Sequence, residues 1–281
     1  MKYPFRKLFW FAAMVMIAGC AGRPTQWDQF HGDSLSRGFQ PIESGFALSS
    51  AWISEPYEIT SSSPVLGTDF EGKEILYVGT TDAHLIAIDT SDGSQKWKRD
   101  VGNGQATRIV STPAVSDKSD IYVISNRQRN DGLASSTLHK VDEFSNLRWS
   151  YTFPDDGFTS ASPKLLNTVG GTFIFVYVSV GGIANLQGEL FVLQDDDNLP
   201  ILLDRKKLGV CHYQSGTADL LNYFKDAQDV VSKFPVPFDI GGLPLPDAFV
   251  APTPAINADR QKPLIAIADN FCSLGAFEWD G

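Results

Sequence analysis

The feature that most constrains the fold of this chain is a repeat built around a Ser-Pro or Thr-Pro pair. Each pair is followed by short runs of Val, Ile, Leu, Tyr and Phe, which Gly, Asp, Ser and Asn separate. The pairs are Ser63-Pro64, Thr112-Pro113, Ser162-Pro163 and Thr253-Pro254. The first three prolines are 49 and 50 residues apart, but the fourth follows the third by 91, so the third unit holds an insertion. A regular period of this size indicates one supersecondary unit per repeat.

The apolar runs of each unit predict short antiparallel strands. In the first unit, residues 75–79 and 85–89 are strongly apolar, and the turn signal Asp92-Gly93 follows them. Val, Ile, Leu and Tyr favour strands that are buried on both faces, and Asp-Gly favours a tight hairpin turn. A sheet of about 50 residues has the size of a propeller blade. The sequence therefore predicts an all-β fold, a β-propeller of four-stranded antiparallel blades of which about four are present.

Two tryptophans recur at the end of the repeat. Trp97 and Trp149 are 52 residues apart, and each follows the last turn of its unit. Because the indole ring buries a large apolar area, we expect both to enter the outer strand and to pack between neighbouring blades. In the third unit Leu202 or Leu203 stands where the Trp belongs. The packing of that outer strand is therefore expected to differ.

The first unit also carries a family resemblance. Its Ser63-Pro64-Val65, Leu76–Gly79, Leu85–Asp89, Asp92-Gly93 and Trp97 look like the PQQ-like repeat. That repeat occurs in quinoprotein dehydrogenases and in the propeller lipoprotein of the outer-membrane β-barrel assembly machinery. Residues 27–33 resemble the segment that precedes the first blade there, and the resemblance covers residues 27–204 and 250–281. It implies a propeller, and it implies either a protein-binding scaffold or a quinone-dependent enzyme.

The number of repeats leaves the closure of the ring open. Propellers close with about 4 to 8 blades, whereas this chain contains three units and most of a fourth. We favour the interpretation that the chain is a piece of a longer protein and that it is truncated at Gly281. A four-blade ring, closed by an outer strand from residues 50–55, is a second interpretation. A half-ring that dimerises is a third.

The N-terminus is typical of an export signal. Lys2, Arg6 and Lys7 precede an apolar run of ten residues, 8–17, which is too short to span a bilayer as a helix. Residues 17–20, Ile-Ala-Gly-Cys, resemble the lipobox of bacterial lipoproteins. The resemblance implies a signal peptide over residues 1–19, acylation of Cys20 and, because Ala21 follows, an outer-membrane location facing the periplasm. Residues 20–60 would then be an N-terminal linker with a ring-closing strand, followed by the blades over residues 61–281.

The charge of the chain limits its partners. The formal net charge is -10 at pH 7. Nucleic-acid binding depends on clustered Lys and Arg, and anionic lipid also attracts basic segments. The sequence therefore predicts no nucleic-acid partner, and it predicts membrane association through the lipid anchor rather than through surface charge.

An insertion over residues 207–250 interrupts the third unit. Within it, residues 217–234 place apolar side chains at steps of three and four, which predicts a small helix. An apolar, Pro-rich loop follows. Because loops on a rigid scaffold often carry binding function, the candidate partner-binding residues are Phe224, Phe234, Phe238, Ile240 and Leu243. A lid that only packs on the blades is the alternative. Cys211 and Cys272 form a possible disulfide in an oxidising periplasm, and two separate buried thiols are equally compatible with the sequence.

The motifs of redox and hydrolytic enzymes are missing from the sequence. PQQ enzymes hold the quinone with an adjacent Cys-Cys disulfide and a Ca²⁺ site of Glu, Asn and Asp, and neither can be matched here. No Cys-x-x-Cys-His or Gly-x-Ser-x-Gly motif is present. His84 and His139 are interpreted as structural, and Asp195–Asp197 as a solvated turn rather than a Ca²⁺ site. We therefore expect no catalytic residues, no metal and no cofactor.

These observations favour a non-enzymatic, membrane-anchored periplasmic propeller that binds a protein or peptide by strand addition or by loop docking. Outer-membrane protein assembly is the process that the resemblance suggests. A PQQ-binding dehydrogenase, or a fragment of one, is the alternative function. A carbohydrate- or polymer-binding surface lipoprotein is the second alternative, which exposed Trp and Tyr would favour.

Overall fold

A computed structural model describes eleven segments of the chain, which together contain strands and turns but no helix. The segments are residues 28–31, 51–59, 62–103, 107–128, 134–154, 157–180, 187–196, 198–208, 253–258, 262–268 and 274–279. The helix that the sequence predicts over residues 217–234 lies outside them. So do Cys20, Cys211 and Cys272, and all five candidate partner-binding residues of the insertion.

In the described segments sixteen strands form four antiparallel sheets, which confirms the all-β prediction. The first sheet contains β1 (Val65–Thr68), β2 (Glu74–Gly79), β3 (His84–Asp89) and β4 (Gln95–Asp100). The second contains β5 (Thr107–Arg108), β6 (Ala114–Val115), β7 (Ile121–Gln128), β8 (Ala134–Val141) and β9 (Leu147–Thr152). The third contains β10 (Lys164–Thr168), β11 (Gly171–Val180), β12 (Gln187–Gln194) and β13 (Ile201–Lys207). The fourth contains β14 (Ala255–Asn257), β15 (Leu264–Ala268) and β16 (Leu274–Glu278).

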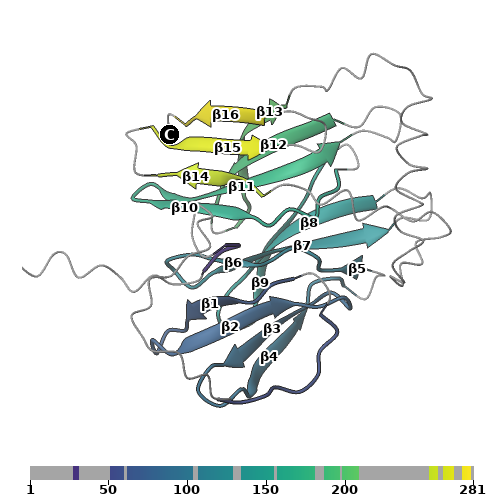
Figure 1. Ribbon diagram of the computed structural model, residues 1–281, viewed down its shortest axis with the longest axis vertical. Helices are drawn as coiled ribbons and strands as arrows, with labels where there is room; N and C mark the ends of the chain where they lie inside the picture. The colour runs from purple at the N-terminus through teal and green to yellow at the C-terminus, as the bar shows by residue number, and fades with distance from the viewer. Residues whose placement is uncertain are drawn as a thin grey trace, which may run out of the picture.

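The sheets stack face to face in sequence order along the long axis of the molecule (Figure 1). Within each sheet every strand pairs with the next strand in sequence, with one exception. β5 pairs with β7 instead of β6, and β6 also pairs with β7. The first and fourth sheets therefore lie at opposite ends of the stack (Figure 1). This is the arrangement of neighbouring blades in a partial propeller.

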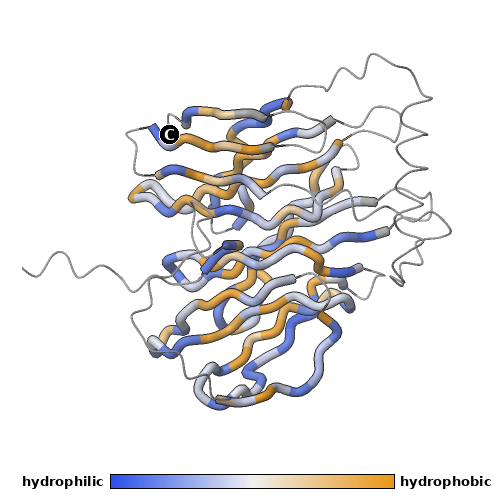
Figure 2. Tube along the Cα trace, in the orientation of Figure 1, coloured by the Kyte–Doolittle hydropathy of each residue, from blue (hydrophilic) through white to orange (hydrophobic). Residues whose placement is uncertain are grey.

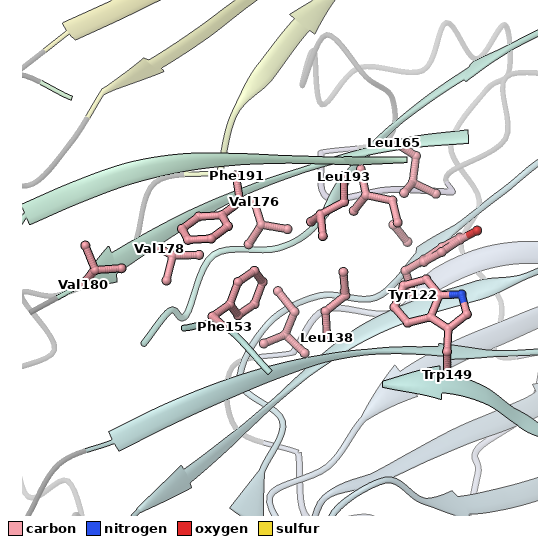
Figure 3. Packing of buried hydrophobic residues seen from close by; sticks show 13 residues of the cluster. Tyr122, Leu138, Trp149, Phe153, Leu165, Val176, Val178, Val180, Phe191 and Leu193 are labelled. Carbon is pink, nitrogen blue, oxygen red and sulfur yellow. The ribbon is translucent and has the colours of Figure 1, made fainter. Parts of the chain in front are cut away.

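The core lies between the sheets. Apolar residues concentrate in the central strands and hydrophilic residues at the turns (Figure 2). Between the second and third sheets, Leu138 and Phe153 meet Val176 and Phe191 (Figure 3), and the two phenylalanine rings pack edge to face at 5.3 Å. Equivalent clusters join the first sheet to the second and the third to the fourth. Because both faces of a middle sheet are covered, its central strands are apolar nearly throughout.

The recurring Ser or Thr links the inner ends of the sheets. The backbone N–H of Ser63 donates to Thr112 Oγ1 (3.1 Å), that of Thr112 donates to Ser162 Oγ (2.9 Å), and that of Ser162 donates to Thr253 Oγ1 (3.1 Å). Each hydroxyl oxygen thus accepts a hydrogen bond from a backbone N–H of the preceding sheet. The proline that follows each Ser or Thr has no N–H and cannot donate. The hydroxyl of the repeat is therefore needed to hold neighbouring sheets at one spacing.

Residues 51–59 differ from the expectation for this region, because they form no strand. Trp52 and Tyr57 pack against Val78, Ile86 and Ile88, on the face of the first sheet that points away from the second. The Trp52 indole donates to the Thr90 carbonyl (2.6 Å). The segment thus covers a face of the first sheet that no other sheet of the described residues covers. It does not contribute an outer strand to the fourth sheet, which lies at the other end of the stack.

Candidate functional site

The outer strands of the first two sheets are anchored to the next sheet by tryptophan, as the sequence predicts. Trp97 packs on Tyr77 of its own sheet, and its Nε1 donates to the Glu143 carbonyl in the β8–β9 turn (2.9 Å). Trp149 packs on Tyr122, and its Nε1 donates to Asp195 Oδ1 in the β12–β13 turn (3.0 Å). Each indole therefore uses both its apolar ring and its N–H at a boundary between sheets.

The third sheet has no such anchor, and the sequence-based alignment of its outer strand was wrong by one or two residues. In all three complete sheets the outer pairing shifts register at the same place, which leaves one residue bulged. Trp97 pairs with Ala87 and Trp149 with Lys140, and Asp204 pairs with Val192 at the equivalent position. Asp204 therefore replaces the Trp. The spacing suggested Leu202 or Leu203 because the β12–β13 connection is longer: Val192 and Asp204 are 12 positions apart, against 10 for Ala87 and Trp97 and 9 for Lys140 and Trp149.

The outer edge of β13 is consequently apolar and exposed. At the bulged position the first two sheets have Lys96 and Arg148, whereas the third has Leu203. Ile201, Leu202 and Leu203 are 48%, 41% and 40% exposed. Leu199 in the preceding turn is 59% exposed. Charged side chains on an edge strand discourage pairing with another chain, so these three positions lack a protection that Asp204–Lys207 give to the rest of β13. We call Ile201–Leu203 the β13 edge.

A buried ion cluster joins the second sheet to the third. Lys140 Nζ lies 2.7 Å from Asp195 Oδ2 and 3.1 Å from Asp120 Oδ2, and its side chain is only 4% exposed. Burial opposes the charge of Lys140, but the hydrogen bond to Asp195 and the attraction of Asp120 outweigh it and raise the pKa of Lys140. Burial also raises the pKa of Asp120. Asp195 is thus a buried partner of Lys140 and Trp149, which corrects the expectation of a solvated turn.

His139 is a second buried polar group, located in the middle of β8. Its Nε2 lies 2.8 Å from Ser125 Oγ and its Nδ1 lies 2.8 Å from Ser150 Oγ, so both ring nitrogens are hydrogen-bonded to hydroxyls. Burial lowers the pKa of His139 to about 4. The ring is therefore neutral at neutral pH. The described contacts link three strands of one sheet and give the ring a structural role.

Comparison with known proteins gives matches in structure only. No protein-family profile matches the sequence, and no curated protein matches it. Among solved structures, the quinohemoprotein alcohol dehydrogenase ADHIIG from Pseudomonas putida HK5 is similar with a TM-score of 0.53 and 15% identity, over 87% of this chain and 34% of that one. The quinohemoprotein alcohol dehydrogenase from Comamonas testosteroni matches with a TM-score of 0.48 and 11% identity, over 94% and 50% of the two chains. BamB from Moraxella catarrhalis matches with a TM-score of 0.46 and 16% identity, over 81% and 49%.

The chain has the fold of a partial β-propeller, which the first of these three structures shares. That conclusion rests on the described sheets, on the inter-sheet hydrogen bonds of the repeat and on the first of these three structures. The chain spans half or less of the length of each matched structure, at 34%, 49% and 50%. At these identities the likeness concerns the arrangement of blades alone.

In the described segments, no group of three His, Cys, Asp or Glu side chains is placed to hold a metal ion. Residues 28–31 also occupy the inner ends of two blades. The carbonyl of Asp28 accepts the Val115 N–H (2.9 Å), Gln29 Oε1 accepts the Leu165 N–H (3.0 Å), and the buried Lys164 donates to the Phe30 carbonyl (2.5 Å).

The remaining sequence-based sites lie outside the described residues. Acylation of Cys20, the Cys211–Cys272 disulfide and the binding role of the insertion therefore stay predictions. Within the described segments no helix is long and apolar enough to cross a membrane. The β13 edge is the feature that sequence reasoning missed. Three consecutive apolar residues after a turn, at the position where the repeat elsewhere has charged residues, are the signal by which it could have been found.

Proposed function

We propose that this chain is a non-enzymatic propeller scaffold that is lipid-anchored through Cys20, faces the periplasm and binds an extended segment of another protein. The propeller fold supplies a rigid body, since its blades are joined by three kinds of contact: apolar clusters, the Ser/Thr hydrogen bonds and the tryptophan anchors. The resemblance of the repeat to that of the outer-membrane assembly lipoprotein makes outer-membrane protein assembly the first process in which to seek the partner.

The observation that carries the proposal is the β13 edge. An edge strand presents unpaired N–H and C=O groups, and an extended peptide that pairs with them gains main-chain hydrogen bonds. Ile201, Leu202 and Leu203 add exposed apolar surface to that edge. In β4 and β9, by contrast, Lys96 and Arg148 occupy the bulged position. A partner strand with apolar side chains is therefore expected to select the third blade.

Site-specific photo-crosslinking in intact cells tests this proposal. A photoreactive amino acid at Leu203 is expected to give discrete adducts with a protein partner. The same amino acid at Arg148, the equivalent position of the second blade, is the matched control and should give none of these adducts. Adding Leu202→Lys should abolish the adducts at position 203 without changing the amount of protein. Equal adducts at positions 203 and 148, or no adduct at either, would contradict the proposal.

The anchor is tested separately. In a cell grown with an alkyne analogue of palmitate, we expect the wild-type chain to incorporate the label and to sediment with the outer membrane. Cys20→Ser should remove the label and release the protein into the soluble periplasmic fraction. Labelling that persists in Cys20→Ser would contradict acylation at that residue. The insertion residues Phe224, Phe234, Phe238, Ile240 and Leu243 stay a second candidate contact, open to the same crosslinking approach.

The alternative functions are open to direct measurement. Titration of the purified chain with PQQ and Ca²⁺, followed by absorbance, should show no stoichiometric uptake, and saturable one-to-one uptake would favour a quinoprotein instead. For a carbohydrate-binding surface, exposed Trp or Tyr would be the supporting observation. Every Trp and Tyr in the described segments is buried or half-buried.

A further inference from the structure

Two exposed phenylalanines meet at the boundary between the first and second blades. Phe70, in the β1–β2 turn, is 67% exposed, and Phe144, in the β8–β9 turn, is 57% exposed. Their ring centroids are 5.3 Å apart with the planes tilted by 37°. Neither ring belongs to a core cluster of the molecule. We call them the Phe70–Phe144 pair.

The turns that carry the pair are held by hydrogen bonds. Asp69 Oδ1 accepts the backbone N–H groups of Glu71 (3.0 Å) and Lys73 (2.9 Å). Asp142 Oδ1 likewise accepts those of Phe144 (3.0 Å) and Asn146 (2.7 Å). The Trp97 anchor ends on the carbonyl of the residue before Phe144, so it also ties the second turn to the first blade. Because both backbones are already fixed, a partner would lose little free energy in ordering them.

The pair is surrounded by negative charge. The turns over residues 69–73, 89–94, 116–120 and 142–146 lie at one end of the first two blades (Figure 1) and hold eight carboxylates but only two lysines. Lys96, Lys140 and Arg148 reach three of these carboxylates from the strands. They leave an excess of negative charge at this end of the molecule.

Glu143, next to Phe144, contributes a charge that no described basic residue pairs with. Its Oε2 is buried and has no hydrogen-bond partner among the described residues. Burial raises the pKa of Glu143, and repulsion from Asp69 and Asp142 adds to the rise, against the lowering by the Phe70 N–H. An approaching cation would relieve that repulsion. The apolar pair and the unbalanced carboxylate therefore favour the same kind of ligand.

We propose that the Phe70–Phe144 pair is a docking surface for a basic segment of another protein, in which an apolar side chain is flanked by Arg or Lys. The apolar side chain packs on the two rings, and a guanidinium or ammonium group gains both from the ring faces and from the carboxylates around them. The same negative charge repels nucleic acid, anionic lipid and a second copy of this chain, whose net charge is -10. This surface lies on the turns of the first two blades and goes beyond the scaffold function proposed for the β13 edge.

A defined peptide tests the proposal on the full-length chain in detergent. The probe is a rhodamine-labelled peptide that alternates Arg with Leu, and its binding is followed by fluorescence anisotropy. We expect the double variant F70S/F144S, which keeps every carboxylate, to bind about tenfold more weakly. The matched control I53S/L199S removes two exposed apolar side chains elsewhere and should bind as the wild type does. Thermal unfolding of both variants should match the wild type, since all four residues are exposed.

The outcomes of this test separate the contribution of the two phenylalanine rings from that of the surrounding carboxylates. Equal affinity of F70S/F144S and the wild type would show adventitious attraction to an acidic surface only and would overturn the proposal, as would absence of binding to the wild type. A peptide with Glu in place of Arg should not bind, and binding of that peptide would refute the cationic requirement. The test is also independent of the β13 edge. Leu202→Lys should remove the adducts at position 203 but leave peptide affinity unchanged, so failure of one proposal can be told from failure of the other.

Discussion

The outer strands of the second and third blades have the same register but opposite surfaces. In β9, Trp149 is buried against the next blade, and Arg148 occupies the bulge. In β13, Asp204 takes the position of the tryptophan and the exposed Leu203 occupies the bulge. The backbone geometry is thus preserved while both the anchor and the edge protection are lost. The same repeat therefore has an outer edge that is protected by a charged residue in β9 and an outer edge that is suited to pairing in β13.

The difference also separates residues that stabilise the fold from residues that a partner can contact. The boundary between the second and third blades is held by Lys140, Asp195 and Trp149, all of them buried. The outer edge of β13 has apolar residues in contact with solvent. Substitutions at the boundary should therefore affect folding, whereas substitutions at the edge should affect association.

The largest expected effect is at Lys140. Lys140→Met leaves Asp195 and Asp120 buried without their cation, and losing one partner of a buried ion pair costs about 3–5 kcal/mol. The control is Lys73→Met in the first blade, where the Lys73 side chain is 59% exposed and pairs with Glu71, itself 47% exposed, and where about 1 kcal/mol or less is expected. Urea unfolding of both variants measures the difference. Equal losses would show that burial does not distinguish the two blades.

Acid should weaken the second blade next most strongly. The pKa of His139 is about 4 in the folded chain against 6.5 for the free side chain, so the unfolded state binds the proton more readily. The contribution of neutral His139 to the free energy of unfolding is fully present above about pH 6.5. It is lost as the pH falls towards 4, and the total loss is about 3 kcal/mol. Urea unfolding across this range, compared with His139→Gln, isolates the contribution. An unchanged pH dependence in His139→Gln would assign the effect to other groups.

The two tryptophan anchors should differ by a smaller amount. Trp149→Phe removes a hydrogen bond to the charged Asp195 and should cost about 2 kcal/mol. Trp97→Phe removes a hydrogen bond to the neutral Glu143 carbonyl and should cost about 1 kcal/mol. Both replacements keep an aromatic ring, so their thermal unfolding midpoints can be compared directly. A larger loss for Trp97→Phe would reverse the ranking of the two boundaries.

The smallest effect on stability is expected at the edge itself. Leu203→Lys gives β13 the charge that β4 and β9 have at the bulge, and an exposed substitution of this kind changes stability by about 0.5 kcal/mol or less. Self-association should nevertheless decrease, because a charged edge strand resists pairing. Light scattering at matched concentration and temperature is the measurement. A clear fall in the unfolding midpoint would mean that Leu203 is part of the core.

The candidate site could be predicted only in part. The tryptophan anchors follow from residue type and spacing, and the structure confirms both. The position of Asp204 could not be predicted by counting residues, because the turn between β12 and β13 is longer than the equivalent turns of the first two blades. The burial of Asp195 was missed because an Asp-rich turn is normally solvated, and only the neighbouring blade removes it from water.

The sequence by itself determined the strands, the turns and the blade as the repeating unit. Alternating apolar runs and turn residues act over a few positions, so they can be read locally. Tertiary structure decided which surfaces remain. Asp195 meets Trp149 and Lys140 from 46 and 55 residues away, and Trp52 covers the first blade from 38 residues away. Such contacts depend on how the blades stack, and this stacking leaves the β13 edge and the Phe70–Phe144 pair exposed to a partner.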